Sequence, residues 1–148
     1  VTEPSPTFSA CFGEAFLPLH PCVYADLLHS KLEEYGCELY LVNTGWTGGP
    51  FGVGERIALD QTRACIKAIL DGNLEASPTV MDPVFGLDVP LEVPGVQARL
   101  LQPRNTWADV KAYDQAAERL AARFIDNFKR FQNENSSDYS KYGPLIFA

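Results

Sequence analysis

A strand, a helix and a second strand follow one another closely near the start of this chain, and this order constrains its fold most. Apolar and small polar residues alternate over Thr7 to Phe12, which predicts a half-buried strand ended by Gly13. Pro21 favours a helix start, and apolar residues recur at helical spacing up to Gly36. Cys37 to Val42 is typical of a short buried strand. Strands alternating with helices over short connections predict an α/β fold, a mixed sheet with packed helices.

The rest of the chain continues this alternation. Arg56 to Leu59 is expected to be extended, and Asp60 can cap a helix from Gln61 to about Leu70. Prolines punctuate residues 77–94, which favours extended edge segments over a central strand. Apolar residues at helical spacing predict a long final helix from about Ala108 to Phe131. We expect residues 1–132 to form the folded segment and residues 133–148 a polar tail.

Size and charge narrow the classes of function. With 148 residues the chain suffices for one ordinary domain. The net charge is −7, and no basic residue lies between Lys67 and Arg99, so binding to nucleic acid or to an anionic membrane is disfavoured. No stretch approaches the roughly 20 apolar residues of a membrane span. The N-terminal residues do not resemble a signal peptide, and the cysteines sit mostly among apolar neighbours, so we expect a reducing, cytoplasmic location.

A glycine-rich stretch, Asn43 to Gly54, invites a phosphate-binding interpretation. The spacing from Gly49 to Gly54 matches the start of a phosphate loop, but Glu55 and Arg56 stand where that loop needs lysine and then serine or threonine. A carboxylate at that place would repel phosphate. The stretch is therefore expected to be either a plain turn or a lid over a ligand.

Candidate catalytic groups are few. No cysteine pair has metal-ligand spacing, and His20, just before Pro21, suits a capping or packing role better than that of a base. Arg56 stands between the glycine-rich stretch and an extended segment, where a cation can contact a ligand. A salt bridge from Arg56 to Asp60 or Glu55 explains its position equally well.

Short motifs along the chain carry a resemblance to a known family. They are Thr2-Glu3-Pro4-Ser5-Pro6-Thr7-Phe8-Ser9-Ala10-Cys11-Phe12-Gly13, Ala15 to Pro21, Leu41-Val42-Asn43-Thr44-Gly45-Trp46, Arg56-Ile57, Thr62-Arg63, Pro94-Gly95-Val96, Pro103-Arg104-Asn105-Thr106-Trp107 and Phe124-Ile125-Asp126-Asn127-Phe128. In this order they resemble the C-terminal part of ATP-dependent phosphoenolpyruvate carboxykinases, from Val1 to about Phe131. The resemblance implies the C-terminal part of a nucleotide-binding lobe.

The resemblance also implies an activity and a site. The family decarboxylates oxaloacetate and phosphorylates the product with ATP, using magnesium together with manganese or calcium. Its phosphate loop, metal ligands and oxaloacetate-binding arginines lie upstream of the point that corresponds to Val1, so this chain is expected to be inactive alone and to require the upstream segment as its partner. Arg56, Ile57 and Thr62 match positions that contact adenine and ribose, and Phe16 matches a residue lining that pocket.

Two other interpretations compete with this one. The chain can be a stand-alone adenine-nucleotide binding or regulatory module that kept the lobe without the chemistry, or a structural α/β domain without a ligand. A trimmed lobe should expose an apolar face that the missing half covers, whereas a stand-alone module should not.

Overall fold

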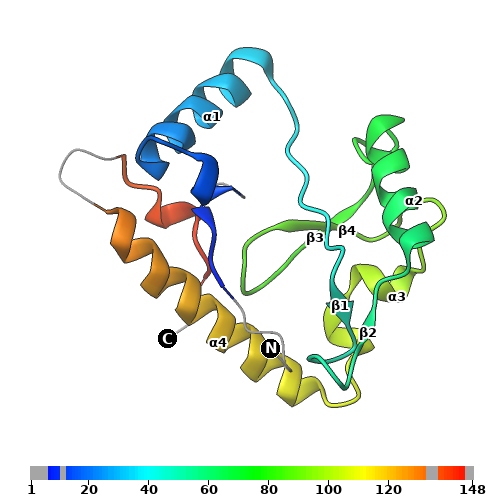
Figure 1. The fold of residues 1–148 in the computed structure, drawn as a ribbon. Coiled ribbons are helices and arrows are strands. Elements are labelled where there is room, and N and C mark those ends of the chain that lie inside the picture. The colour runs from blue at the N-terminus through cyan, green and yellow to red at the C-terminus, as the bar shows by residue number, and fades with distance from the viewer. Residues whose placement is uncertain (1–6, 11–12, 133–136, 146–148) are drawn as a thin grey trace.

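The computed structural model describes residues 7–10, 13–132 and 137–145. Its helices are α1 (Pro21–Tyr35), α2 (Leu59–Leu70), α3 (Ala98–Leu101) and α4 (Val110–Phe128), with 3-10 turns η2 (Glu14–Phe16), η3 (Pro103–Thr106), η4 (Lys129–Phe131) and η5 (Ser140–Tyr142). Its strands are β1 (Trp46–Thr47), β2 (Glu55–Arg56), β3 (Thr79–Met81) and β4 (Asp88–Pro90). Figure 1 shows α1 and α2 on opposite sides of the molecule, with α4 running along one edge. None of the helices in the described part of the chain is long and apolar enough to cross a membrane.

Helix α1 has the ends that the sequence predicts. The Nδ1 atom of His20 accepts a hydrogen bond from the backbone N–H of Cys22 at 3.4 Å, so His20 is a cap, as expected. The helix ends at Gly36, whose φ of 60° is a left-handed conformation that glycine adopts without a Cβ penalty. Cys22 is the buried residue of this helix, and its Sγ donates to the carbonyl of Phe131.

Helix α4 is also confirmed, from Val110 to Phe128 rather than from Ala108 to Phe131, with the last three of those residues in the 3-10 turn η4. Asp109 caps it by accepting hydrogen bonds from the backbone N–H groups of Lys111 and Ala112. Ala117 and Ala121 are buried, so small residues allow other segments to approach the helix closely. Near its C-terminal end the ring of Phe124 meets those of Phe8 and Phe85 edge-on, at 5.0 and 6.2 Å between centroids.

The strands form two small antiparallel sheets instead of one mixed sheet. In the first, Trp46 lies opposite Arg56 and Thr47 opposite Glu55. In the second, β3 pairs with β4, and Pro90 ends the ladder, which confirms extended edge segments in the proline-rich region. The chain therefore mixes helices and strands as predicted, while the single mixed sheet is not formed among the residues that the structure describes.

The two strands predicted at Thr7 to Phe12 and at Cys37 to Val42 are not formed among the described residues. Residues 7–10 form no strand, and the N–H of Gly13 donates to the carbonyl of Ala10 in a local turn instead. Cys11 and Phe12 lie outside the described residues. The segment 37–42 is irregular, with Leu39 and Leu41 about three-fifths exposed. A strand needs a neighbour for its backbone groups, and the described chain places none beside these segments.

One further boundary, the start of α2, differs from expectation. Helix α2 begins at Leu59, two residues before the predicted start, and Ala58 occupies the capping position. Asp60 therefore lies inside the first turn, where its Oδ1 accepts a hydrogen bond from the N–H of Gln61. At the C-terminal end the chain returns to the body, because the N–H of Leu145 donates to the carbonyl of Val84 at 2.6 Å and the Tyr139 hydroxyl bonds Asp26 on α1.

Candidate functional site

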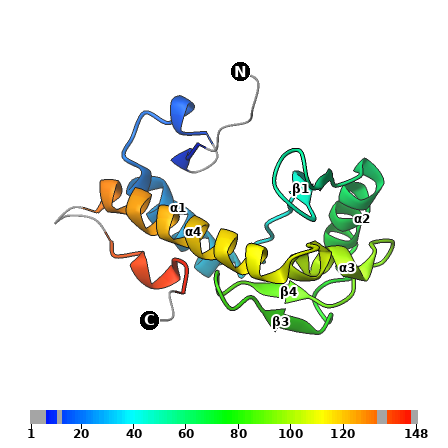
Figure 2. The same ribbon diagram turned by 90° about the horizontal axis from the view of Figure 1, so that it is seen from below.

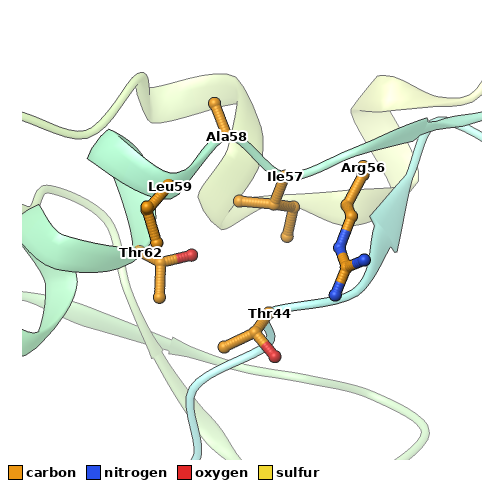
Figure 3. A pocket seen from close by; sticks show the side chains of 6 residues that line it. All are labelled: Thr44, Arg56, Ile57, Ala58, Leu59 and Thr62. Atoms are coloured by element: carbon orange, nitrogen blue, oxygen red, sulfur yellow. The ribbon is translucent and has the colours of Figure 1, made fainter.

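An open hollow of about 490 Å³ lies where β2 leads into α2 (Figure 3). Six residues line it: Thr44, Arg56, Ile57, Ala58, Leu59 and Thr62. Thr44 precedes β1, Arg56 ends β2, and the remaining four belong to the junction and the first turn of α2. The hollow is thus built on a strand-to-helix junction with one wall from the segment before β1.

Local backbone bonds fix this junction. The N–H of Ile57 donates to the carbonyl of Gly45 at 2.8 Å, which extends the pairing of β1 and β2 by one more link. The N–H of Thr62 then donates to the carbonyl of Ala58 at 3.2 Å as α2 starts. Because the helix begins within three residues of the strand, Thr62 lies one turn along the helix from Ala58 and faces the same space as Ile57.

The side chains approach that space from different directions. Figure 3 shows Ile57 extending into the middle, the Arg56 guanidinium on one side and the Thr62 hydroxyl on the other. Together they offer an apolar wall, a planar cation and a hydroxyl. This combination suits a flat, partly polar ligand.

The salt-bridge alternative for Arg56 is wrong in this structure. Glu55 pairs with Arg99 at 3.8 Å, and Asp60 accepts from the N–H of Gln61. Within the described part of the chain no carboxylate lies at ion-pair distance from Arg56. Its guanidinium is therefore available to a ligand.

Phe16 is not brought to this hollow. It lies in η2, is 90% exposed and does not line the hollow. The blue segment that contains η2 lies apart from β1 and α2 in both views of the ribbon (Figures 1 and 2). The long exposed connection through residues 37–44 separates α1 and the segment before it from the β1–β2 hairpin. Among the sequence-predicted residues the structure thus gathers Arg56, Ile57 and Thr62 only.

The glycine-rich stretch forms the turn of the β1–β2 hairpin. Gly48 and Gly52 have φ values of 77° and 85°, and the ring of Phe51 meets that of Trp46 edge-on at 5.4 Å between centroids. No residue from 48 to 54 lines the hollow. This geometry agrees with the interpretation as a turn that supports the hairpin.

Three lining residues were missed by sequence reasoning: Thr44, Ala58 and Leu59. Ala58 and Leu59 directly follow the predicted Arg56 and Ile57, so an earlier helix start is the signal that reveals them. Thr44 lies in the quoted motif Leu41 to Trp46 but becomes a neighbour only through the hairpin.

The described side chains do not fit a metal ion. No group of three or more histidine, cysteine, aspartate or glutamate residues gathers in residues 7–10, 13–132 and 137–145. Of the cysteines in these ranges, Cys22 is buried, Cys37 is exposed and Cys65 is half-buried, and burial raises the pKa of the Cys65 thiol. No set of metal donors therefore marks a reaction centre in this part of the chain.

Fold and hollow together define a segment of helices and short strands with an open hollow at a strand-to-helix junction. Comparison with known proteins identifies the family. The model of the phosphoenolpyruvate carboxykinase family matches residues 1–99. Similar proteins include the phosphoenolpyruvate carboxykinases (ATP) of Thermus thermophilus, 55% identical over 97% of this chain, and of Brevibacillus brevis, 52% identical over 99%. The chain belongs to the phosphoenolpyruvate carboxykinase family.

The alignments cover almost all of this chain but only about a quarter of each relative. The chain spans about 27% of the length of the Thermus thermophilus relative and 28% of the Brevibacillus brevis one. The phosphoenolpyruvate carboxykinase (ATP) of Campylobacter jejuni subsp. doylei is 50% identical over 99% of this chain, which again corresponds to only 28% of the relative.

Proposed function

We propose that this chain is the C-terminal part of an ATP-dependent phosphoenolpyruvate carboxykinase and supplies its adenosine pocket. The complete enzyme would convert oxaloacetate and ATP to phosphoenolpyruvate, carbon dioxide and ADP. One observation carries the proposal: in a chain of this family, Arg56, Ile57 and Thr62 face one hollow at a strand-to-helix junction, and Arg56 has no ion-pair partner among the described residues.

The three side chains have the chemistry that adenosine requires. A planar guanidinium such as that of Arg56 can lie against the face of a purine, where the cation and the π-system attract each other. Ile57 provides apolar contact for the base, and the Thr62 hydroxyl can donate to or accept from a ring nitrogen or a sugar hydroxyl. Phe16 is not part of the proposed pocket, because it does not line the hollow.

The metal ions of the reaction belong, in this proposal, to the remainder of the enzyme. Magnesium together with manganese or calcium would compensate the charge of the phosphates during transfer. The described residues hold no cluster of ligands for such ions, and the glycine-rich hairpin lacks the lysine of a phosphate loop. We therefore assign this chain to the nucleoside end of ATP and the phosphate and metal chemistry to polypeptide outside it.

The surface of the chain favours a component of a larger enzyme over a stand-alone nucleotide-binding module. The solvent-accessible surface area of the chain is 11,002 Å². A compact monomer of 16.3 kDa exposes about 7,500 Å². Large apolar side chains contribute to the excess, among them Leu70 at 80% and Val53 at 75% exposed. Such a surface is expected where another part of the same protein packs.

Replacing Arg56 in the full-length enzyme tests the proposal. We expect Arg56→Ala to weaken ATP binding by about 1–3 kcal/mol through loss of stacking and charge, with little change in the KM for oxaloacetate. Arg63→Ala is the matched control, because Arg63 lies exposed on α2 and does not line the hollow. Equal ATP affinity in the wild type and Arg56→Ala would show that the adenosine pocket lies elsewhere.

A further inference from the structure

The hydroxyl group of Thr106 connects the β1–β2 hairpin to η3, a segment distant in the sequence. Its Oγ1 lies 3.0 Å from the Oγ1 of Thr47, 3.0 Å from the backbone nitrogen of Gly48 and 2.7 Å from the carbonyl oxygen of Pro103. Thr106 thus links η3 to β1 and to the first residue of the glycine-rich turn. The two threonines are 59 positions apart in the sequence.

Counting protons fixes the direction of these bonds. The Thr106 hydroxyl has one proton, which it donates to the carbonyl of Pro103, and two lone pairs, which accept from the N–H of Gly48 and from the hydroxyl of Thr47. The one donor proton and both acceptor lone pairs of the Thr106 hydroxyl then take part in hydrogen bonds. Thr47 is only 7% exposed and is the one buried polar residue within the described part of the chain, so its hydroxyl depends on this partner.

The link reaches Arg56 through the hairpin register. Thr47 lies opposite Glu55 in the ladder, and the neighbouring pair is Trp46 opposite Arg56. The position of Thr47 therefore sets the position of the strand that carries Arg56. A Cβ atom on Gly48 would approach the carbonyl oxygen of Thr106 to 3.3 Å, which shows how closely η3 and the turn are packed.

The other end of the link is anchored on α4. Arg104, two residues before Thr106, bonds both carboxylate oxygens of Asp114, and the ring of Trp107 meets that of Tyr113 edge-on at 5.6 Å between centroids. These contacts hold η3 against the first turns of α4 on both sides of Thr106. The long helix thereby supports the hairpin through one hydroxyl group.

We infer that Thr106, acting with Thr47, is a positioning residue that holds Arg56 in its place beside the nucleotide. The inference rests on the proposed function, because it concerns the same hollow. Thr106 does not line the hollow, so it would act on a bound nucleotide only through Arg56. Removing its hydroxyl should loosen the hairpin and displace the guanidinium while leaving the remainder of the active site intact.

The experiment uses the full-length enzyme and compares Thr106→Val with Thr106→Ser. Valine keeps the shape of threonine but removes the hydroxyl, so we expect the KM for ATP to rise about 3- to 10-fold with the KM for oxaloacetate unchanged. Serine keeps the hydroxyl and should restore an ATP KM close to that of the wild type. If Thr106→Val does not fold, Thr47→Val removes the same bond from the other side and should raise the ATP KM in the same way.

A double-mutant cycle with Arg56→Ala separates positioning from general destabilisation. If Thr106 acts through Arg56, adding Thr106→Val to Arg56→Ala should change the ATP KM by less than about twofold. Effects that multiply in the double variant, or an unchanged ATP KM in both Thr106→Val and Thr47→Val, would overturn the inference. An Arg56→Ala variant with normal ATP affinity would instead overturn the proposed function, so the two failures are distinguishable.

Discussion

The guanidinium of Arg104 donates two hydrogen bonds to the carboxylate of Asp114, from Nε to Oδ1 at 2.7 Å and from Nη2 to Oδ2 at 2.9 Å. This fork geometry is specific to arginine, and it lowers the pKa of Asp114 and raises that of Arg104. Both side chains remain accessible to water, so the pair fixes the direction of η3 relative to α4 more than it adds stability.

This pair predicts a pH-dependent contribution to stability. Since the pKa of Asp114 is lowered in the folded chain, its contribution is present above the ordinary aspartate pKa of about 3.9 and is lost as the pH falls through the lowered value. We expect Asp114→Asn to be less stable than the wild type near neutral pH and to converge with it under acid conditions. Urea unfolding of the full-length enzyme across this range measures the difference.

Glu118→Gln is the matched control, because Glu118 lies exposed on the same helix and has no ion pair among the described residues. It should leave the dependence on pH unchanged. A stability difference between the wild type and Asp114→Asn that stays constant from neutral to acid pH would contradict the role of the ion pair.

Alanine substitutions at two glycines of the glycine-rich turn, Gly54 and Gly52, should have different effects on ATP binding. A Cβ atom on Gly54 would collide with the carbonyl oxygen of Thr47, whereas nothing lies within 4 Å of a Cβ on Gly52. Gly54→Ala should therefore force β1 and β2 apart, lower the free energy of unfolding by about 1–3 kcal/mol and weaken ATP binding. Gly52→Ala, with a φ of 85°, should cost only the left-handed strain of about 1–2 kcal/mol and leave ATP binding intact. Similar ATP affinities in both variants would refute this distinction.

The N-terminus of α4 offers a third test. The Oδ1 of Asp109 accepts hydrogen bonds from the N–H groups of Lys111 and Ala112, at 2.9 and 3.2 Å. Asp109→Ala leaves both donors to water and should lower the free energy of unfolding by about 1 kcal/mol, while Asp109→Asn keeps an accepting oxygen and should lower it by much less. Chemical denaturation of the two variants measures the order, and equal losses would show that the charge, not the bond, matters.

The isolated 148-residue chain should form no phosphoenolpyruvate and should show no metal-dependent ATP hydrolysis. Its sequence lacks the lysine of a phosphate loop, and its described residues lack a group of metal ligands. A coupled assay for phosphoenolpyruvate, with the full-length enzyme as the positive control, measures this. Turnover by the highly purified chain would refute the division of roles proposed above.

Sequence reasoning succeeded for several local determinants of helix ends, although it placed the start of α2 two residues late. The ends of α1 depend on His20, Pro21 and Gly36, and the start of α4 on Asp109, all of which act within one helical turn. The segment 37–42 has a strand-like composition, but a strand also requires a partner, and composition does not supply one. The segment is consequently irregular and exposed in the described chain.

The residues of the candidate site likewise fall into those that sequence proximity predicts and those that it does not. Arg56, Ile57 and Thr62 meet because a strand runs directly into a helix, so their proximity follows from sequence separation. Thr47 and Thr106 escaped sequence analysis, since a bond between two hydroxyl groups far apart along the chain produces no local pattern. Phe16 was expected in the pocket through resemblance alone, and the fold keeps it on another part of the surface.

The large exposed area has a thermodynamic consequence. An extended chain of 16.3 kDa exposes about 23,600 Å², so this segment buries only about half of that area on folding, compared with about 70% for a compact domain of similar length. The heat-capacity increment of unfolding scales with the apolar area that becomes exposed. Separated from its surroundings, the segment should therefore melt with a small increment and over a broad range of temperature. If the chain has the proposed function, cooperative folding belongs to the full-length enzyme, and the hollow that Arg56 lines should become rigid only as neighbouring polypeptide packs against it.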